Sequence, residues 1–146
     1  MFRGSSPAKI DDKGRLKIPT DFRRDIEERH GLDLFVTSLK GDSVMIYPLP
    51  VWEEIEARLQ NVPSTDRAKA RFLARVNYYG QQVRLDVQGR ILIPQLLRES
   101  AGMNGDAVVT GQLDHLVVWN HERFLRLLEE EPLTDEDFRA LTQYGI

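Results

Sequence analysis

The chain has 146 residues, of which 41% are hydrophobic and 29% charged, with no cysteine and a formal net charge of −3. A chain of this length can form a stable hydrophobic core without disulfide bonds or structural metals. The lack of cysteine excludes a disulfide framework, thiolate metal sites and thiol catalysis. The net charge argues against a uniformly basic nucleic-acid binder, and no apolar run reaches the roughly 18–20 residues of a membrane span.

The first predicted elements lie in a basic segment. Residues 1–24 carry seven basic and three acidic side chains. Within this segment, Arg15-Leu16-Lys17-Ile18 alternates polar and apolar residues, which is typical of a strand with one buried face. Gly14 precedes the strand at a predicted tight turn, and Pro19 begins a helix that we expect to end at Gly31.

A hairpin and two helices are predicted next. Strands at 35–37 and 44–47 flank a turn at 40–42. One helix has an apolar stripe and an exposed i,i+4 ion pair between Glu54 and Arg58; the stripe consists of Trp52, Ile55, Leu59 and Val62. The following helix has arginines at i,i+4 spacing, namely Arg67, Arg71 and Arg75. These arginines could line a DNA channel, but we favour an exposed face or pairs with acids of the neighbouring helix: Glu53, Glu54 and Glu56.

The same order of elements then recurs, which indicates an internal duplication. Residues 10–19 align with residues 85–94 at an offset of 75, and the later strands align with 108–110 and 116–119. In the second copy, Arg90-Ile91-Leu92-Ile93 has three apolar residues in a row, so we expect a strand buried on both faces. A helix ending at Gly102 and a hairpin turn at 112–115 complete the correspondence.

The last segment is predicted to be helical and acidic. A helix is expected from Phe124, and Thr134-Asp135-Glu136-Asp137 is typical of a capping box that opens a short final helix. Residues 121–146 carry seven acidic and three basic side chains, the reverse of the first segment. One face of the protein could therefore meet a polyanion while the acidic end keeps it soluble.

These elements predict an α+β fold built from two small copies. A copy of roughly 45 residues buries too little apolar surface to be stable alone. Two copies packed about a pseudo-twofold axis, with interleaved hairpins, would share one core and cover strand edges. We also expect homo-oligomerisation, because such an arrangement leaves surfaces free for further copies.

The pattern Asp-x-x-Gly-Arg-Φ-x-Φ-Pro, with Φ apolar, occurs at 11–19 and again at 86–94. Together with Met1-Phe2-Arg3-Gly4, the doubled pattern resembles the tandem-repeat members of the AbrB/SpoVT-like swapped-hairpin family over nearly the whole chain. The resemblance implies a tandem duplicated swapped-hairpin β-barrel with flanking helices, assembled into a ring-like homo-oligomer. It also implies a cytoplasmic, nucleoid-associated DNA-binding transcriptional regulator. The expected targets are repeated elements upstream of the division and cell-wall gene cluster, which includes the protein's own gene.

The resemblance and the charge pattern divide the chain into four parts. We expect the first repeat at 5–50 to bind DNA, connecting helices at 51–79, a second repeat at 80–124 that serves assembly, and acidic helices at 125–146. The two copies differ around their arginines: Lys13 and Lys17 flank Arg15, whereas Gln88 and Leu92 occupy the matching positions of the second copy.

The candidate DNA-binding residues follow from this division. Arg15 could present a bidentate fork to guanine in the major groove, while the other cations contact phosphates; these cations are Lys13, Lys17, Arg3 and Lys9. The motif residues carried over from the family are Asp11, Gly14, Arg15, Asp86, Gly89 and Arg90. Asp11 is the natural partner of Arg15, and each Asp–Arg pair could instead be an ion pair that only holds the fold. For Asp86 and Arg90 we favour that structural role.

Other classes of function have weaker support. Asp11 and Asp12 lack further carboxylates at ligand spacing, and three histidines show no zinc pattern: His30, His115 and His121. We therefore expect no enzyme, no catalytic residue, no metal, no cofactor, no small-molecule substrate and no membrane contact. The expected partners are double-stranded DNA and further copies of the chain. The alternative is an antitoxin-like or scaffold protein of the same superfamily, whose acidic C-terminal region binds a basic partner.

Overall fold

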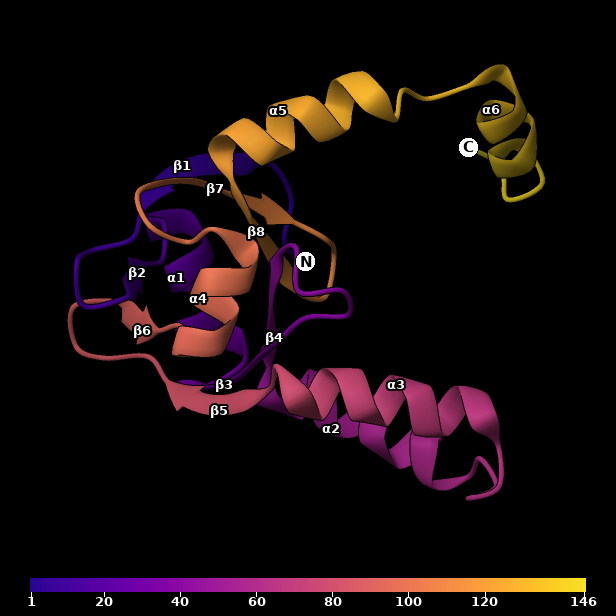
Figure 1. Cartoon of the computed structure of the whole chain (residues 1–146), viewed down its shortest axis with the longest axis horizontal. Coiled ribbons are helices and arrows are strands. Elements are labelled where there is room, and N and C mark those ends of the chain that lie inside the picture. Colours follow the sequence, from indigo (N-terminus) through magenta and orange to yellow (C-terminus); the bar gives the residue numbers. More distant parts are fainter.

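The computed structural model describes residues 1–146 and has a mixed α+β architecture, as predicted (Figure 1). Its eight strands are β1 (Ser5–Lys9), β2 (Arg15–Lys17), β3 (Asp33–Thr37), β4 (Val44–Pro48), β5 (Gln81–Arg84), β6 (Arg90–Leu92), β7 (Asp106–Gly111) and β8 (Leu116–Asn120). Its six helices are α1 (Thr20–Arg29), α2 (Leu49–Gln60), α3 (Arg67–Tyr78), α4 (Gln95–Ala101), α5 (His121–Glu130) and α6 (Asp135–Thr142).

Strands from both halves of the chain share every sheet. The large antiparallel sheet has the order β1-β7-β8-β4-β3-β5, so the first strand of each half pairs with a hairpin of the other half. The small sheet consists of β2 from the first half and β6 from the second. Neither half therefore completes a sheet by itself.

One hydrophobic core lies between these sheets and the helices α1 and α4. It contains 20 buried residues, and both short strands contribute to it through Leu16 and Ile91. In α1, Phe22 and Ile26 stand four residues apart, so both point to the core from one face of the helix. Pro19 precedes this helix and Gly31 follows it, as expected, and α4 ends at Gly102 in the left-handed conformation.

The expectation for the strand around Ile91 was wrong. Leu92 is 49% exposed, whereas Ile91 is 1% exposed, so β6 has one buried face and one open face. Three apolar residues in a row conceal this alternation in the sequence. The alternation is present in the structure because β6 pairs only with β2 and packs on the core with one face only.

The helices α2 and α3 form a hairpin that projects from the body (Figure 1). A small second core attaches it, in which Trp52 stacks on Phe35 with ring centroids 4.7 Å apart. The predicted stripe is shorter than expected, because α2 ends at Gln60, before Val62. The expected ion pair between Glu54 and Arg58 is absent, and no ion pair joins the arginines of α3 to the acids of α2.

The C-terminal helices extend away from the sheets on the same side of the view as this hairpin (Figure 1). The capping box of α6 is confirmed: the Asp137 N–H donates to Thr134 Oγ1 at 3.1 Å, and the Thr134 N–H donates to Asp137 Oδ2 at 2.9 Å. No helix of the structure combines the length and the apolar character needed to span a membrane.

Candidate nucleic-acid interface

The first motif forms a tight turn that is held by one carboxylate. Asp11 Oδ1 accepts hydrogen bonds from the backbone N–H groups of Lys13 at 3.0 Å and Arg15 at 2.8 Å. Its Oδ2 accepts from Arg15 Nε at 2.8 Å. Asp11 therefore closes the turn and also orients the guanidinium that follows it.

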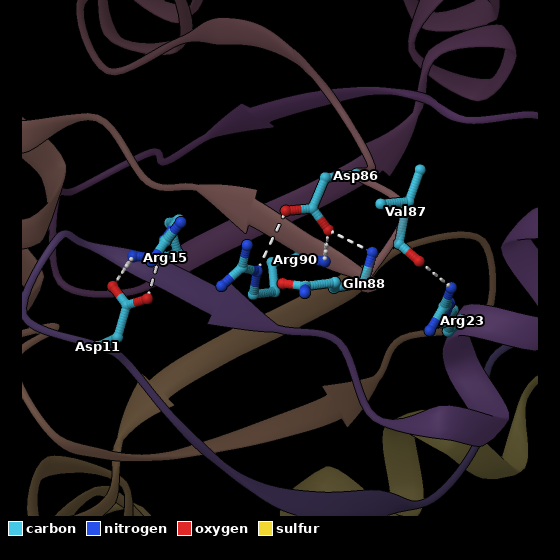
Figure 2. Close-up of polar contacts among 7 residues, drawn as sticks. All are labelled: Asp11, Arg15, Arg23, Asp86, Val87, Gln88 and Arg90. Carbon is cyan, nitrogen blue, oxygen red and sulfur yellow. Dashed lines mark hydrogen bonds and ion pairs between the residues drawn. The ribbon is translucent and has the colours of Figure 1, made fainter.

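The second motif repeats this geometry (Figure 2). Asp86 Oδ1 accepts from the backbone N–H groups of Gln88 at 2.9 Å and Arg90 at 2.8 Å, and Oδ2 accepts from Arg90 Nε at 3.1 Å. In both arginines only Nε is engaged within the chain, which leaves the two Nη groups without a partner. Those groups form the end of the guanidinium fork that matches guanine or phosphate.

Each turn contains a glycine that no other residue could replace without strain. Gly14 has φ +82° and Gly89 has φ +76°, both in the left-handed region. A Cβ on Gly14 would collide with the Arg98 side chain of α4, and a Cβ on Gly89 would lie 2.7 Å from Arg23 Cδ of α1. Each turn is thus covered by an arginine from the other half of the chain.

These two covering arginines also occupy matching positions at the offset of 75. Arg23 Nη2 donates to the Val87 carbonyl at 2.9 Å (Figure 2). Its Nε pairs with Glu27 at 2.8 Å. Arg98 Nε is buried without a hydrogen-bond partner. Neither arginine is among the residues predicted for the site, although their matching positions in the two copies are a signal in the sequence.

The arginines of the two motifs lie on one face of a two-stranded ribbon. In the β2–β6 pair, Arg15 is opposite Leu92, Leu16 is opposite Ile91, and Lys17 is opposite Arg90. Directly opposed residues of antiparallel strands share a face, and the face alternates along each strand. One face of the ribbon therefore buries Leu16 and Ile91, and the other carries Arg15, Lys17, Arg90 and Leu92. We call the latter the ribbon face.

The hydrogen bonds at the turns also fix the charge of the two aspartates. The backbone N–H of Arg15 is the main cause that lowers the pKa of Asp11 below its ordinary 3.8, and the Arg15 side chain adds to this effect. The pKa of Asp86 is lowered in the same way by Arg90. Both turns are therefore held by ionised carboxylates at neutral pH.

The remaining candidate cations do not all lie near the ribbon. Lys13 is exposed at the tip of the first turn, and Lys9 of β1 lines a depression of about 280 Å³ together with Lys17. Arg3 lies apart from them, because the neighbouring Phe2 is bridged to Leu113 in the β7–β8 turn. Four predicted cations, Lys9, Lys13, Arg15 and Lys17, thus lie on or beside the ribbon, whereas Arg3 does not.

The site is a two-stranded ribbon with one basic face on a mixed α+β scaffold. No three side chains among His, Cys, Asp and Glu lie close enough to hold a metal ion. A family model described as "MraZ protein, putative antitoxin-like" matches residues 1–75 and 80–144. The chain belongs to the MraZ family.

Relatives that align over most or all of the chain agree with this assignment. The chain is 51% identical over 146 residues to a protein of Acidobacterium capsulatum named "Transcriptional regulator MraZ", and all of both chains is covered. A protein of the same name from Koribacter versatilis is 46% identical, again with full coverage of both. One from Shewanella sp. strain MR-7 is 33% identical over 89% of this chain and 86% of its own. The solution structure of PHS018 from Pyrococcus horikoshii aligns with a TM-score of 0.34 and 13% identity over 81% of this chain and 88% of its own, a likeness too weak to add to the argument.

Proposed function

We propose that this protein is a sequence-specific DNA-binding transcriptional regulator that contacts DNA with its ribbon face. The observation that carries the proposal is the pairing of β2 with β6, which collects Arg15, Lys17 and Arg90 on one open face. The relatives named as transcriptional regulators support the same class of function.

A two-stranded ribbon is one of the two elements that fit the major groove of B-DNA. The free Nη groups of Arg15 and Arg90 would donate to O6 and N7 of guanine, and the carboxylates behind them would keep the guanidinium groups oriented. Lys13, Lys17 and Lys9 would contact phosphates on either side. In the sequence-based prediction the second repeat mainly serves assembly, whereas here Arg90 of that repeat also contacts DNA.

The fold that we propose is a tandem duplicated swapped hairpin with pseudo-twofold symmetry. It is supported by the reciprocal pairing of β1 with β7 and of β5 with β3. We further propose a ring-like homo-oligomer larger than a dimer, located in the cytoplasm at the nucleoid. Its targets would be repeated elements upstream of the division and cell-wall gene cluster, including the protein's own gene.

Assembly would raise the DNA affinity, which is low for a single ribbon. One ribbon offers only a few cationic contacts, and affinity from such contacts falls steeply with salt. Several ribbons held in one assembly would engage successive DNA repeats at high effective concentration. An acidic protein could in this way bind a polyanion.

The proposal is tested by fluorescence anisotropy with a duplex from the region upstream of this protein's gene and a scrambled duplex. The proteins compared are the wild type, Arg15→Ala, and Arg58→Ala as a matched control, because Arg58 is an exposed, unpaired arginine on α2. We expect the wild type and the control to prefer the upstream duplex by more than about tenfold, a difference of about 1.4 kcal/mol. Arg15→Ala should lose that preference. Equal weak binding of both duplexes by all three proteins would overturn the proposal.

The alternative, an antitoxin-like or scaffold protein, is favoured by one observation: the acidic C-terminal helices expose apolar side chains. A gene for a toxin-like protein beside this one would support the alternative, whereas division genes would support the regulator.

A further inference from the structure

The C-terminal arm, residues 125–146, exposes apolar side chains that nothing in the chain covers. Six of its side chains are between 50% and 80% exposed: Leu125, Leu128, Leu133, Phe138, Tyr144 and Ile146. Every residue of α6 except Leu141 is exposed. Isolated helices shorter than about 12–15 residues are marginal in water, so an eight-residue helix of this kind needs a packing partner.

The arm also carries an acidic cluster that makes no ion pair within the chain. Residues 129–137 contain six acids and no base, namely Glu129, Glu130, Glu131, Asp135, Glu136 and Asp137. None of the six takes part in an ion pair of the chain. A partner for this surface must therefore combine apolar area with positive charge.

The helix α3 offers positive charge and one exposed aromatic ring. It contains four basic residues and no acid, and Arg67, Arg71 and Arg75 form an exposed row along one side; we call this the arginine row. No ion pair of the chain uses the arginine row. At the end of the same helix, Tyr78 is 64% exposed.

We infer that the C-terminal arm packs on α3 of a second copy of this chain, with its acids facing the arginine row. Both surfaces belong to the same chain, yet no ion pair joins them within it, and both project from the body in the same direction (Figure 1). The apolar side chains supply the burial, and the opposite charges fix the register of the contact. The ribbon face takes no part in this contact.

When the arm of one copy binds α3 of a neighbour and its own α3 binds the arm of a third copy, the contact is heterologous. Contacts of this kind close into a ring when the rotation between neighbours allows it and form open filaments otherwise. The inference rests on the proposed homo-oligomer, for which it names the interface. It also gives the connecting helices and the C-terminal arm a common role in assembly.

The test measures the mass of the full-length protein in the absence of DNA by light scattering after size exclusion. Arg71→Glu with Arg75→Glu should reduce the mass of the assembly at least twofold, as should Glu130→Arg with Glu136→Arg. Neither pair includes a residue of the capping box. The chain that carries all four substitutions should regain the wild-type mass, because the charges are exchanged on both sides of the contact. Lys40→Glu with Arg58→Glu is the matched control and should keep the wild-type mass, since both residues are exposed and unpaired.

Several results would overturn the inference. One is that the wild type assembles and both charge-reversed variants have the same mass as the wild type. This result would leave the proposed assembly and the proposed DNA binding intact. Another is loss of mass in both pairs without recovery in the fourfold variant. If the arginine-row variant kept its mass but lost DNA affinity, the row would contact DNA instead. A wild type with the mass of one 16.9 kDa chain at all concentrations would refute the proposed assembly as well.

Discussion

The substitution Gly14→Ala tests whether the turn before Arg15 is shaped by its contact with α4. Gly31 is the reference position, because it has a similar φ of +87° but nothing within 4 Å of an added Cβ. Gly31→Ala should therefore cost only the left-handed conformation, about 1–2 kcal/mol. At Gly14 the added Cβ would lie 2.6 Å from Arg98 Cδ and still closer to the guanidinium. Overpacking of this kind costs about 1–3 kcal/mol, so Gly14→Ala should cost about 2–5 kcal/mol in total.

The assay is urea denaturation at one fixed protein concentration, because assembly makes the apparent stability depend on concentration. A double-mutant cycle with Arg98→Ala separates the two contributions. In the background of Arg98→Ala, Gly14→Ala should cost no more than Gly31→Ala does in the wild type. If Gly14→Ala and Gly31→Ala differed by less than about 0.5 kcal/mol in the wild-type background, the proposed crowding of the turn by Arg98 would be refuted.

Two further predictions concern the turns and the ribbon. The carboxyl groups of Asp11 and Asp86 should titrate below 3.8 in the folded protein, so their stabilisation is present above the ordinary pKa and disappears as the pH falls through the lower folded value. Carbon NMR of the carboxyl groups measures this, and midpoints at or above 3.8 would contradict the hydrogen bonds described. In urea denaturation, Ile91→Ala should cost about 2–5 kcal/mol because Ile91 is buried. Leu92→Ser should change the free energy of unfolding by no more than about 0.5 kcal/mol. Similar losses of stability for the two substitutions would show that β6 is buried on both faces.

The parts of the fold that depend on local pattern were predictable from the sequence. The turn glycines, the prolines before α1 and α4 and the capping box at Thr134 each act within a few residues, and all lie where the pattern indicated. The link between Asp11 and Arg15 was predictable for the same reason. An aspartate four residues before an arginine, with a glycine between them, can reach both the turn and the guanidinium.

The pairing between distant segments was not predictable from local pattern. The 75-residue offset relates β2 to β6 as copies, but similarity between copies does not state that they pair with each other. That pairing brings Arg90 beside Lys17 and exposes Leu92. Without it, the second motif has only apolar or uncharged neighbours in the sequence, which favours a structural role. The candidate site predicted from the sequence lies in the first repeat, whereas the ribbon face contains residues of both repeats.

The DNA affinity of Arg90→Ala, measured against salt concentration beside Arg15→Ala and Arg58→Ala, tests this composite face most directly. If both strands of the ribbon contact DNA, Arg90→Ala should weaken preference for the upstream duplex by about 1–3 kcal/mol where the contact is to a base. Where the contact is to a phosphate, it should instead reduce the slope of log K against log salt by about 0.9. Arg15→Ala should have an effect of the same size, and Arg58→Ala should have none. Binding by Arg90→Ala that matched the wild type in both preference and slope, while Arg15→Ala lost its preference, would contradict the composite face and restore a site formed by the first repeat alone.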